Sequence, residues 1–157
     1  ALAADYFSRA AEGAKESQRA EDEAEILNNL SVTLLKAGKA QEAYDAALGT
    51  DLVFAEHNDI KRQAMAMGNI AGALEDLKDY PHALEIYNQA LELLKGQNFN
   101  DIRSAIFRRK SEVQRSMGNN YQAVAALDLS LDEKPSRNLN DKFLKGILNR
   151  FFMRGKE

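Results

Sequence analysis

Apolar residues recur along most of this chain at intervals of three and four positions, which is the spacing of one face of an α-helix. The clearest runs are Ile26, Leu27, Leu30, Leu34 and Leu35; Met67, Ile70, Ala71, Leu74 and Leu77; and Ala83, Tyr87, Ala90, Leu91 and Leu94. Polar, glycine-containing stretches around Gly38, Gly96 and Gly118 separate them. The segments between these stretches are about 15–18 residues long. The pattern predicts about eight helices, paired as hairpins.

The composition supports a helical fold. The 157 residues include 24 Ala and 19 Leu, whereas Val, Ile and Thr together supply only 13, too few for a large sheet. The formal net charge is −3, which argues against a dedicated nucleic-acid binder. No apolar run approaches the roughly 20 residues needed to cross a bilayer. We therefore expect neither nucleic acid as a partner nor a membrane span.

The chain contains no cysteine, which removes disulfides, zinc–thiolate sites, iron–sulfur clusters and a cysteine nucleophile. It begins Ala-Leu-Ala-Ala, without a starting Met and without the basic segment of a signal peptide. We take it as a fragment or processed chain. Because a cysteine-free chain suits a reducing compartment, we expect a cytoplasmic protein.

Three segments align without a gap at a period of 40 residues: 27–43, 67–83 and 107–123. Three columns of the alignment carry structural information: a small residue in the first helix, a turn residue, and an alanine five positions after the turn. Their members are Ser31, Ala71 and Ser111; Gly38, Lys78 and Gly118; and Ala43, Ala83 and Ala123. Small residues let two helices approach closely, which a helical hairpin needs where its helices cross. The period therefore predicts stacked helical hairpins.

Leu77–Leu93, with its small–aromatic–small spacing, resembles the turn and second helix of the tetratricopeptide (TPR) family. A period of 40 in place of the usual 34 is similar to the long-helix branch, which includes scaffolds of the Pins type and kinesin light chains. HEAT and armadillo repeats share the period but not the small–aromatic–small spacing. The resemblance implies an all-α, right-handed superhelical TPR solenoid of antiparallel helix pairs.

The register predicts a single domain over residues 1–157. Its parts are the second helix of a partial repeat at 1–18, full repeats at 24–58, 64–98 and 104–135, and a capping helix or partial repeat at 141–157. The last helix carries a broad apolar stripe, which we expect to cap the array on the helix around 124–131 and to support self-association. The stripe consists of Phe143, Leu144, Ile147, Leu148, Phe151 and Phe152.

No motif for catalysis stands out. The two histidines, His57 and His82, have no partner at a recognisable metal-ligand spacing, and Gly68 and Gly72 suit helix packing better than phosphate binding. We predict no enzyme, no catalytic or metal-binding residue and no cofactor. The resemblance implies a protein–protein interaction module, a scaffold or adaptor. The alternative is a ligand-sensing or regulatory domain cut from a larger regulator or enzyme, because fold alone does not settle function.

In the TPR family the first helix of each repeat lines a concave groove that binds peptides, and an Asn there commonly contacts the ligand backbone. Carried over by position, this implies that Asn29 and Asn69 bind the partner, with Arg109 at the equivalent place. Neighbouring partner-binding candidates are Val32, Asp76 and Glu112.

Charge adds to this prediction, because residues 103–115 are basic and residues 16–25 are acidic. We expect Arg108, Arg109 and Arg115 to favour a protein or peptide with an acidic segment, since an arginine can donate two parallel hydrogen bonds to one carboxylate. The third repeat also departs from the others: it has Lys110 and Gln114 where the second has Ile70 and Leu74. This difference predicts a looser or rotated third hairpin, or a partner that covers it.

Overall fold

A computed structural model describes residues 2–16, 19–134, 136 and 138–154, with side chains described as far as residue 150. Its described residues form helices and no strand, so the predicted all-α class is confirmed. Contacts between Cα atoms divide the chain into two compact units, residues 1–95 and 96–157.

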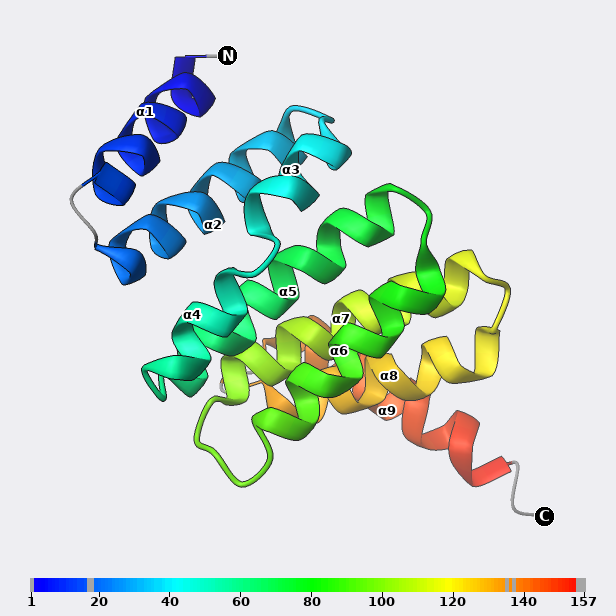
Figure 1. Cartoon of the computed structure of the whole chain (residues 1–157). Coiled ribbons are helices and arrows are strands. Elements are labelled where there is room, and N and C mark those ends of the chain that lie inside the picture. Colours follow the sequence, from blue (N-terminus) through cyan, green and yellow to red (C-terminus); the bar gives the residue numbers. More distant parts are fainter. Residues whose placement is uncertain (1, 17–18, 135, 137, 155–157) are drawn as a thin grey trace. The chain divides into compact units, whose positions relative to one another are not determined.

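Unit 1 is a series of packed helices in which α2 packs on α1 and α3, and α5 packs on α4 and α6 (Figure 1). α3 and α4 follow each other in sequence, and both pack on α2 and on α5. Its helices are α1 (Leu2–Glu16), α2 (Ala20–Lys36), α3 (Ala40–Ala47), α4 (Thr50–Glu56), α5 (Ile60–Asp76) and α6 (Tyr80–Leu93). The first helices α2 and α5 also contact each other directly. Unit 2 contains α7 (Asn100–Ser116), α8 (Asn120–Glu133) and α9 (Leu139–Arg154). In this unit α8 packs on both α7 and α9.

The turn that closes each predicted hairpin has the same geometry in all three copies. Gly38, Lys78 and Gly118 adopt positive φ angles of 73°, 68° and 79°. The amide of the next residue then donates back to the carbonyl five positions earlier, as from Asp79 to Leu74 at 2.9 Å. This is the Schellman ending of an α-helix, which needs a left-handed residue and prefers glycine there. The aligned turn column is therefore a backbone requirement, and Lys78 meets it without being glycine.

Directly after each turn the second helix crosses the first at an alanine. Ala43 and Ala83 are completely buried, and Ala123 is nearly so. In unit 1 the crossing belongs to an apolar cluster that joins α2, α3 and α5, formed by Leu30, Leu34, Ala43 and Ala73. A second cluster joins α2, α4 and α5 through Ala24, Phe54 and Ala66. Small residues at the centre and leucines around them hold the helices at close range.

The second helix of the first repeat is broken, which the sequence pattern did not indicate. α3 ends at Ala47 because Leu48 is extended and Gly49 is left-handed, with φ at 82°. The buried Thr50 then restarts the chain as α4, and its hydroxyl donates to the carbonyl of Ala47 at 2.7 Å. Glycine tolerates the left-handed conformation and so permits the bend.

The third hairpin keeps buried apolar residues such as Val113 and Leu131 and adds hydrogen bonds between its helices. The Ser111 hydroxyl donates to the carbonyl of Ala123 at 2.7 Å, and the Ser104 hydroxyl donates to that of Ser130 at 2.8 Å. Gln114 accepts from the Asn119 side chain at 2.8 Å, at the turn. Polar residues at these columns are thus accommodated within the hairpin itself, which remains in close contact along α7 and α8.

α9 packs against α8 by charge as well as by apolar contact. The Lys145 ammonium lies 2.7 Å from carboxylate oxygens of both Asp128 and Asp132. Leu148 is buried, but Phe143 and Ile147 are 73% and 47% exposed. The side chains of Phe151 and Phe152 lie outside the described residues. Self-association through α9 stays a prediction.

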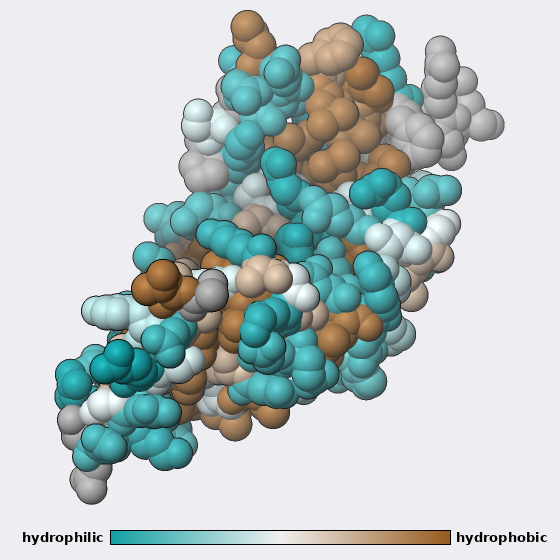
Figure 2. Space-filling model, turned by 90° about the horizontal axis from the view of Figure 1, so that it is seen from above, coloured by the Kyte–Doolittle hydropathy of each residue, from teal (hydrophilic) through white to brown (hydrophobic). Residues whose placement is uncertain are grey.

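The face of the molecule drawn in Figure 2 is largely hydrophilic between patches of apolar side chains. Large apolar side chains that are exposed occur in both units, and they include Leu48, Leu52 and Met65 in unit 1 and Tyr121, Leu129 and Leu139 in unit 2. Within the described residues, no helix is both long enough and apolar enough to span a membrane.

The crossing at Ala83 predicts the cost of a larger side chain. Because Ala83 has no exposed surface, Ala83→Leu should overpack the α5–α6 crossing and lower the free energy of unfolding by about 1–3 kcal/mol. Ala105→Leu, at an exposed position of α7, is the matched control and should change it by less than about 0.5 kcal/mol. Urea denaturation measures both, and equal effects would contradict the tight crossing.

Two glycines with open space around them predict opposite effects of the same substitution. A Cβ atom at Gly38 or at Gly13 would meet nothing within 4 Å, so the effect of Ala on stability depends on the backbone conformation alone. Gly38 is left-handed, and Gly38→Ala should destabilise by about 1 kcal/mol. Gly13 lies inside α1, where Ala is the better helix former, and Gly13→Ala should stabilise by about 0.5–1 kcal/mol. Thermal denaturation measures both variants, and a shift of the midpoint temperature in the same direction for both would contradict the prediction.

Candidate protein-binding surface

The first helices of unit 1, α2 and α5, are joined by an amide pair. The Asn69 side-chain amide donates to the Oδ1 atom of Asn28 at 2.8 Å, and the Asn28 amide donates to the Ala24 carbonyl at 3.0 Å. These bonds fix both amides across the boundary between two hairpins. Among the described residues, the Asn69 Oδ1 atom has no hydrogen-bond partner, so Asn69 retains an acceptor.

The predicted partner-binding residues of unit 1 lie on the same two helices. Asn29 is exposed on α2 beside the amide pair, and Val32 is half-buried almost one turn further along. Asp76 is exposed at the end of α5. The structure brings Asn69 onto Asn28 and not onto its aligned equivalent Asn29.

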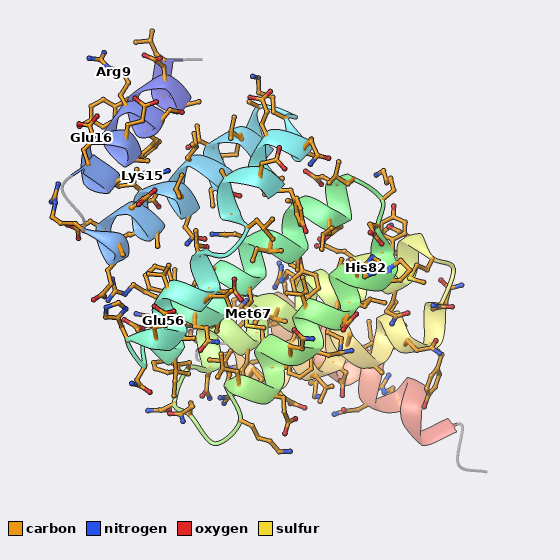
Figure 3. The ribbon with its side chains drawn as sticks, in the orientation of Figure 1. Arg9, Lys15, Glu16, Glu56, Met67 and His82 are labelled. Carbon is orange, nitrogen blue, oxygen red and sulfur yellow. The ribbon has the colours of Figure 1, made fainter. Side chains whose placement is uncertain are left out.

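Gly68 precedes Asn69 and adds an unobstructed stretch of helix. A Cβ atom at Gly68 would meet nothing within 4 Å, although the residue is only half-exposed. The backbone of α5 is therefore open to an approaching chain at this point. We call Asn29, Val32, Gly68, Asn69 and Asp76 the amide face of unit 1. Figure 3 shows Met67, the residue before Gly68, in the middle of α5.

A charged cluster centred on Arg62 lies at the N-terminal end of the same helices. The Arg62 guanidinium lies 2.7 Å from Glu21, 2.6 Å from Asp59 and 3.6 Å from Glu25. It also stacks over the Phe54 ring, 4.9 Å from its centroid. Arg62 is about one-third exposed, so these contacts tie α2, α4 and α5 together.

The acidic stretch at residues 16–25 thus serves packing in part, because Glu21 and Glu25 neutralise Arg62. Sequence reasoning missed this cluster. The available signal was Asp59 as a helix N-cap with Arg62 three positions later, opposite an acidic helix start. His57 adds a contact to Glu21 at 3.4 Å.

Asp59 caps α5 by accepting the backbone N–H of Arg62 at 2.8 Å. This hydrogen bond and the Arg62 guanidinium lower the pKa of the Asp59 carboxyl below its ordinary value. A lowered pKa means that the folded protein favours the carboxylate, so its contribution is present above the ordinary pKa and is lost as pH falls.

The basic stretch of α7 in unit 2 divides into paired and exposed residues. Arg103 is mostly buried and bonds Glu133 at 2.9 Å, which joins α7 to α8. Arg109 pairs with Glu112 at 3.4 Å on α7 itself. Lys110 is half-buried, and its desolvation lowers the pKa of its ammonium. Arg108 and Arg115 are exposed, seven positions apart on one side of α7.

The predicted residues therefore form two sets, one in each unit. Asn29, Val32, Asn69 and Asp76 share α2 and α5, whereas Arg108, Arg109, Glu112 and Arg115 share α7. Within the described part of the chain, no group of three or more His, Asp or Glu side chains could hold a metal ion. These surfaces offer amides, exposed helix backbone and separated charges, which suit recognition of another chain.

The N-cap of α5 predicts a pH-dependent stability. Asp59→Ala removes the cap and the ion pair, and should lower the free energy of unfolding by about 0.5–2 kcal/mol near neutral pH. The difference from the parent should shrink as the pH falls through the lowered pKa of Asp59. Asp59→Asn keeps an N-cap acceptor and should cost less. Urea denaturation across a pH series measures this, and a difference that stays constant down to the lowest pH would contradict it.

Comparison with curated proteins finds no match to this chain. A protein-family model described as "Soluble NSF attachment protein, SNAP" matches residues 1–154. This family is a TPR-like helical-hairpin solenoid, a non-catalytic scaffold that mediates protein interactions, so the predicted repeat class and scaffold role are confirmed at that level. The narrower resemblance to Pins-type scaffolds and kinesin light chains stays a prediction. Because the match covers nearly the whole chain, the protein belongs to the SNAP family.

Proposed function

We propose that this chain is an attachment scaffold that binds a protein partner through the amide face of unit 1. The observation that carries the proposal is the Asn28–Asn69 hydrogen bond, which holds an amide in place beside the open backbone at Gly68. A fixed amide loses little conformational entropy on binding, so its hydrogen bonds contribute more to affinity. No step of the proposal needs a catalytic group.

The chemistry of the amide face suits a chain that passes close to α5. Asn29 and Asn69 offer donors and acceptors to the backbone of a bound segment. Gly68 lets that segment approach without a side chain in the way, and Val32 offers apolar contact beside it. Asp76 adds a negative charge at one end, which orients a segment that carries a cation there.

The exposed arginines of α7 supply a second contact in the proposal. In the proposal Arg108 and Arg115, which are exposed, contact an acidic segment of the partner, and Arg109 divides its contacts between that segment and Glu112. Contacts of exposed arginines are weakened by salt, whereas neutral hydrogen bonds of the amide face are not. The two surfaces are therefore separable by ionic strength.

The family is named for attachment to NSF, and NSF is the partner to test. Gly68→Phe should fill the open space and weaken binding of NSF about tenfold or more. Asn69→Ala should weaken the free energy of binding to NSF by about 0.5–1.5 kcal/mol, and by the same amount at both salt concentrations. Arg108→Ala combined with Arg109→Ala should flatten the dependence of affinity on salt. Isothermal titration calorimetry at two salt concentrations measures all three.

Gly13→Phe is the matched control, because Gly13 is also a helical glycine with open space at its Cβ position. It should leave the affinity for NSF unchanged. If Gly68→Phe and Gly13→Phe bind NSF as tightly as the parent, the amide face is not the binding surface. If the parent itself does not bind NSF, attachment to NSF through this chain is refuted.

A further inference from the structure

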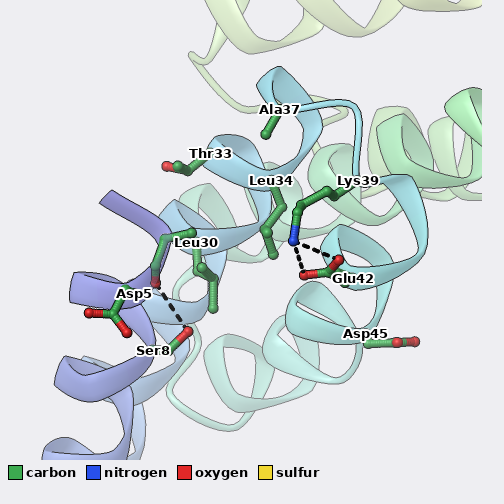
Figure 4. A pocket seen from close by; sticks show the side chains of 10 residues that line it. Asp5, Ser8, Leu30, Thr33, Leu34, Ala37, Lys39, Glu42 and Asp45 are labelled. Atoms are coloured by element: carbon green, nitrogen blue, oxygen red, sulfur yellow. Dashed lines mark hydrogen bonds and ion pairs between the residues drawn. The ribbon is translucent and has the colours of Figure 1, made fainter. Parts of the chain in front are cut away.

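A groove lies in unit 1 between α1 and α3, with α2 as its floor (Figure 4). It has a volume of about 630 Å³. Leu30 and Leu34 of α2 form the floor and are only 7% and 5% exposed. The rim is polar, and Figure 4 shows Asp5 and Asp45 on opposite sides of the two leucines.

A second groove repeats this construction one hairpin further along. It lies between α3 and α6 on the floor of α5 and has a volume of about 400 Å³. Leu74 lies at its floor, 40 positions after Leu34, and Glu85 lies on its rim, 40 positions after Asp45. α3 separates the two grooves, with Asp45 lining the first and Tyr44 lining the second. The 40-residue repeat has therefore built the same groove twice.

The rims carry an excess of negative charge. Asp5, Asp45 and Glu85 stand at equivalent positions of successive repeats, and all three are exposed. None of them forms an ion pair within the described residues. Instead, glutamine amides hold two of them from the same helix, Gln41 to Asp45 at 2.9 Å and Gln89 to Glu85 at 3.4 Å.

The cationic side chains that line the two grooves are already paired. The Lys39 ammonium lies 2.9 Å from both carboxylate oxygens of Glu42. His82 lies 2.6 Å from Asp79 at the start of α6, where Figure 3 labels it. Within the described residues, these pairs leave Asp5 and Asp45 without an ion-pair partner beside the apolar floors. Glu85 also acts on His82, because its charge, after that of Asp79, raises the pKa of the imidazole.

We propose that the two grooves form a docking surface for a cationic amphipathic segment of a partner protein. Its apolar side chains enter the grooves over Leu34 and Leu74, and its Lys or Arg side chains contact Asp5, Asp45 and Glu85. Charge complementarity selects this occupant, because an anionic segment would meet three carboxylates without a free cation between them. The two grooves lie on either side of α3, and packed helices lie about 8–10 Å apart. Apolar side chains two turns apart on a bound helix are separated by a similar distance, so one helix can reach both grooves.

This surface is distinct from the amide face. It uses the second helices α1, α3 and α6, and it uses the side of α2 that carries Leu30 and Leu34. The inference therefore goes beyond the proposed function, and a partner on one surface leaves the other accessible.

The probe is a synthetic amphipathic helical peptide made of Leu and Lys, with a fluorescent label, titrated by anisotropy against the full chain. Asp45→Lys combined with Glu85→Lys should weaken its binding about tenfold or more. Glu56→Lys combined with Asp101→Lys, at exposed positions of α4 and α7 outside both grooves, has the same net charge and should change binding less than about threefold. Peptides with Glu for Lys or Ser for Leu should bind at least about tenfold more weakly than the Leu/Lys peptide.

The absence of cysteine from the chain allows the site to be located directly. A single Cys at Ala37→Cys, which lines the first groove, should form a disulfide with a cysteine-bearing peptide. Lys61→Cys, exposed on α5 outside both grooves, should not. Circular dichroism checks that each variant is folded.

Three results would overturn the proposal: no binding of the peptide to the parent, equal weakening by the two double variants, or trapping at Lys61→Cys as efficient as at Ala37→Cys. Gly68→Phe separates the two hypotheses, because it should leave peptide binding unchanged while it weakens binding of NSF. A failure of NSF to bind would contradict only the proposal for the amide face, and a failure of the peptide to bind would contradict only the proposal for the grooves.

Discussion

The structure depends on the close crossing of two helices immediately after a left-handed turn. The turn residue directs the chain back along the first helix, and the alanine five positions later is buried at the point of contact. A larger side chain there would separate the helices, and the leucines around the crossing would lose their contacts. Because the constraint recurs every 40 residues, positions 40 apart occupy equivalent places in successive hairpins.

Hairpins that obey the same constraint are tied together by different chemistry. In unit 1 the leucines around Ala43 and Ala73 form an apolar cluster, and the Arg62 cluster and the Asn28–Asn69 pair connect neighbouring hairpins through polar contacts. In unit 2 the helices of the third hairpin are joined by the hydroxyls of Ser104 and Ser111. A buried hydroxyl that donates to a backbone carbonyl is satisfied locally, so the hairpin tolerates Ser104 at a column where the first two repeats have Ala24 and Ala64.

The repeat also explains why one short unit can present two unlike surfaces. Successive positions on a helix lie about 100° apart, so Asn29 and Leu30 face different directions although they are neighbours in the sequence. One side of α2 and α5 carries amides and an open glycine, and the other side carries leucines bordered by the carboxylates of α1, α3 and α6. The two proposed binding surfaces therefore lie on different sides of the same helices.

The sequence alone determined the helical class, the period of 40, the turn column and the alanine column, because these depend on local conformation and on residue size. It also indicated the helices that carry the predicted partner-binding residues. Only the tertiary structure decided that Asn69 bonds Asn28 and not Asn29, that Arg62 draws Glu21 and Glu25 into packing, and that Arg103 is held by Glu133. It also decided the break between α3 and α4 at Gly49. Periodicity shows which side of a helix is buried, but the partner of each polar side chain depends on the offset between helices, which arises only when they pack.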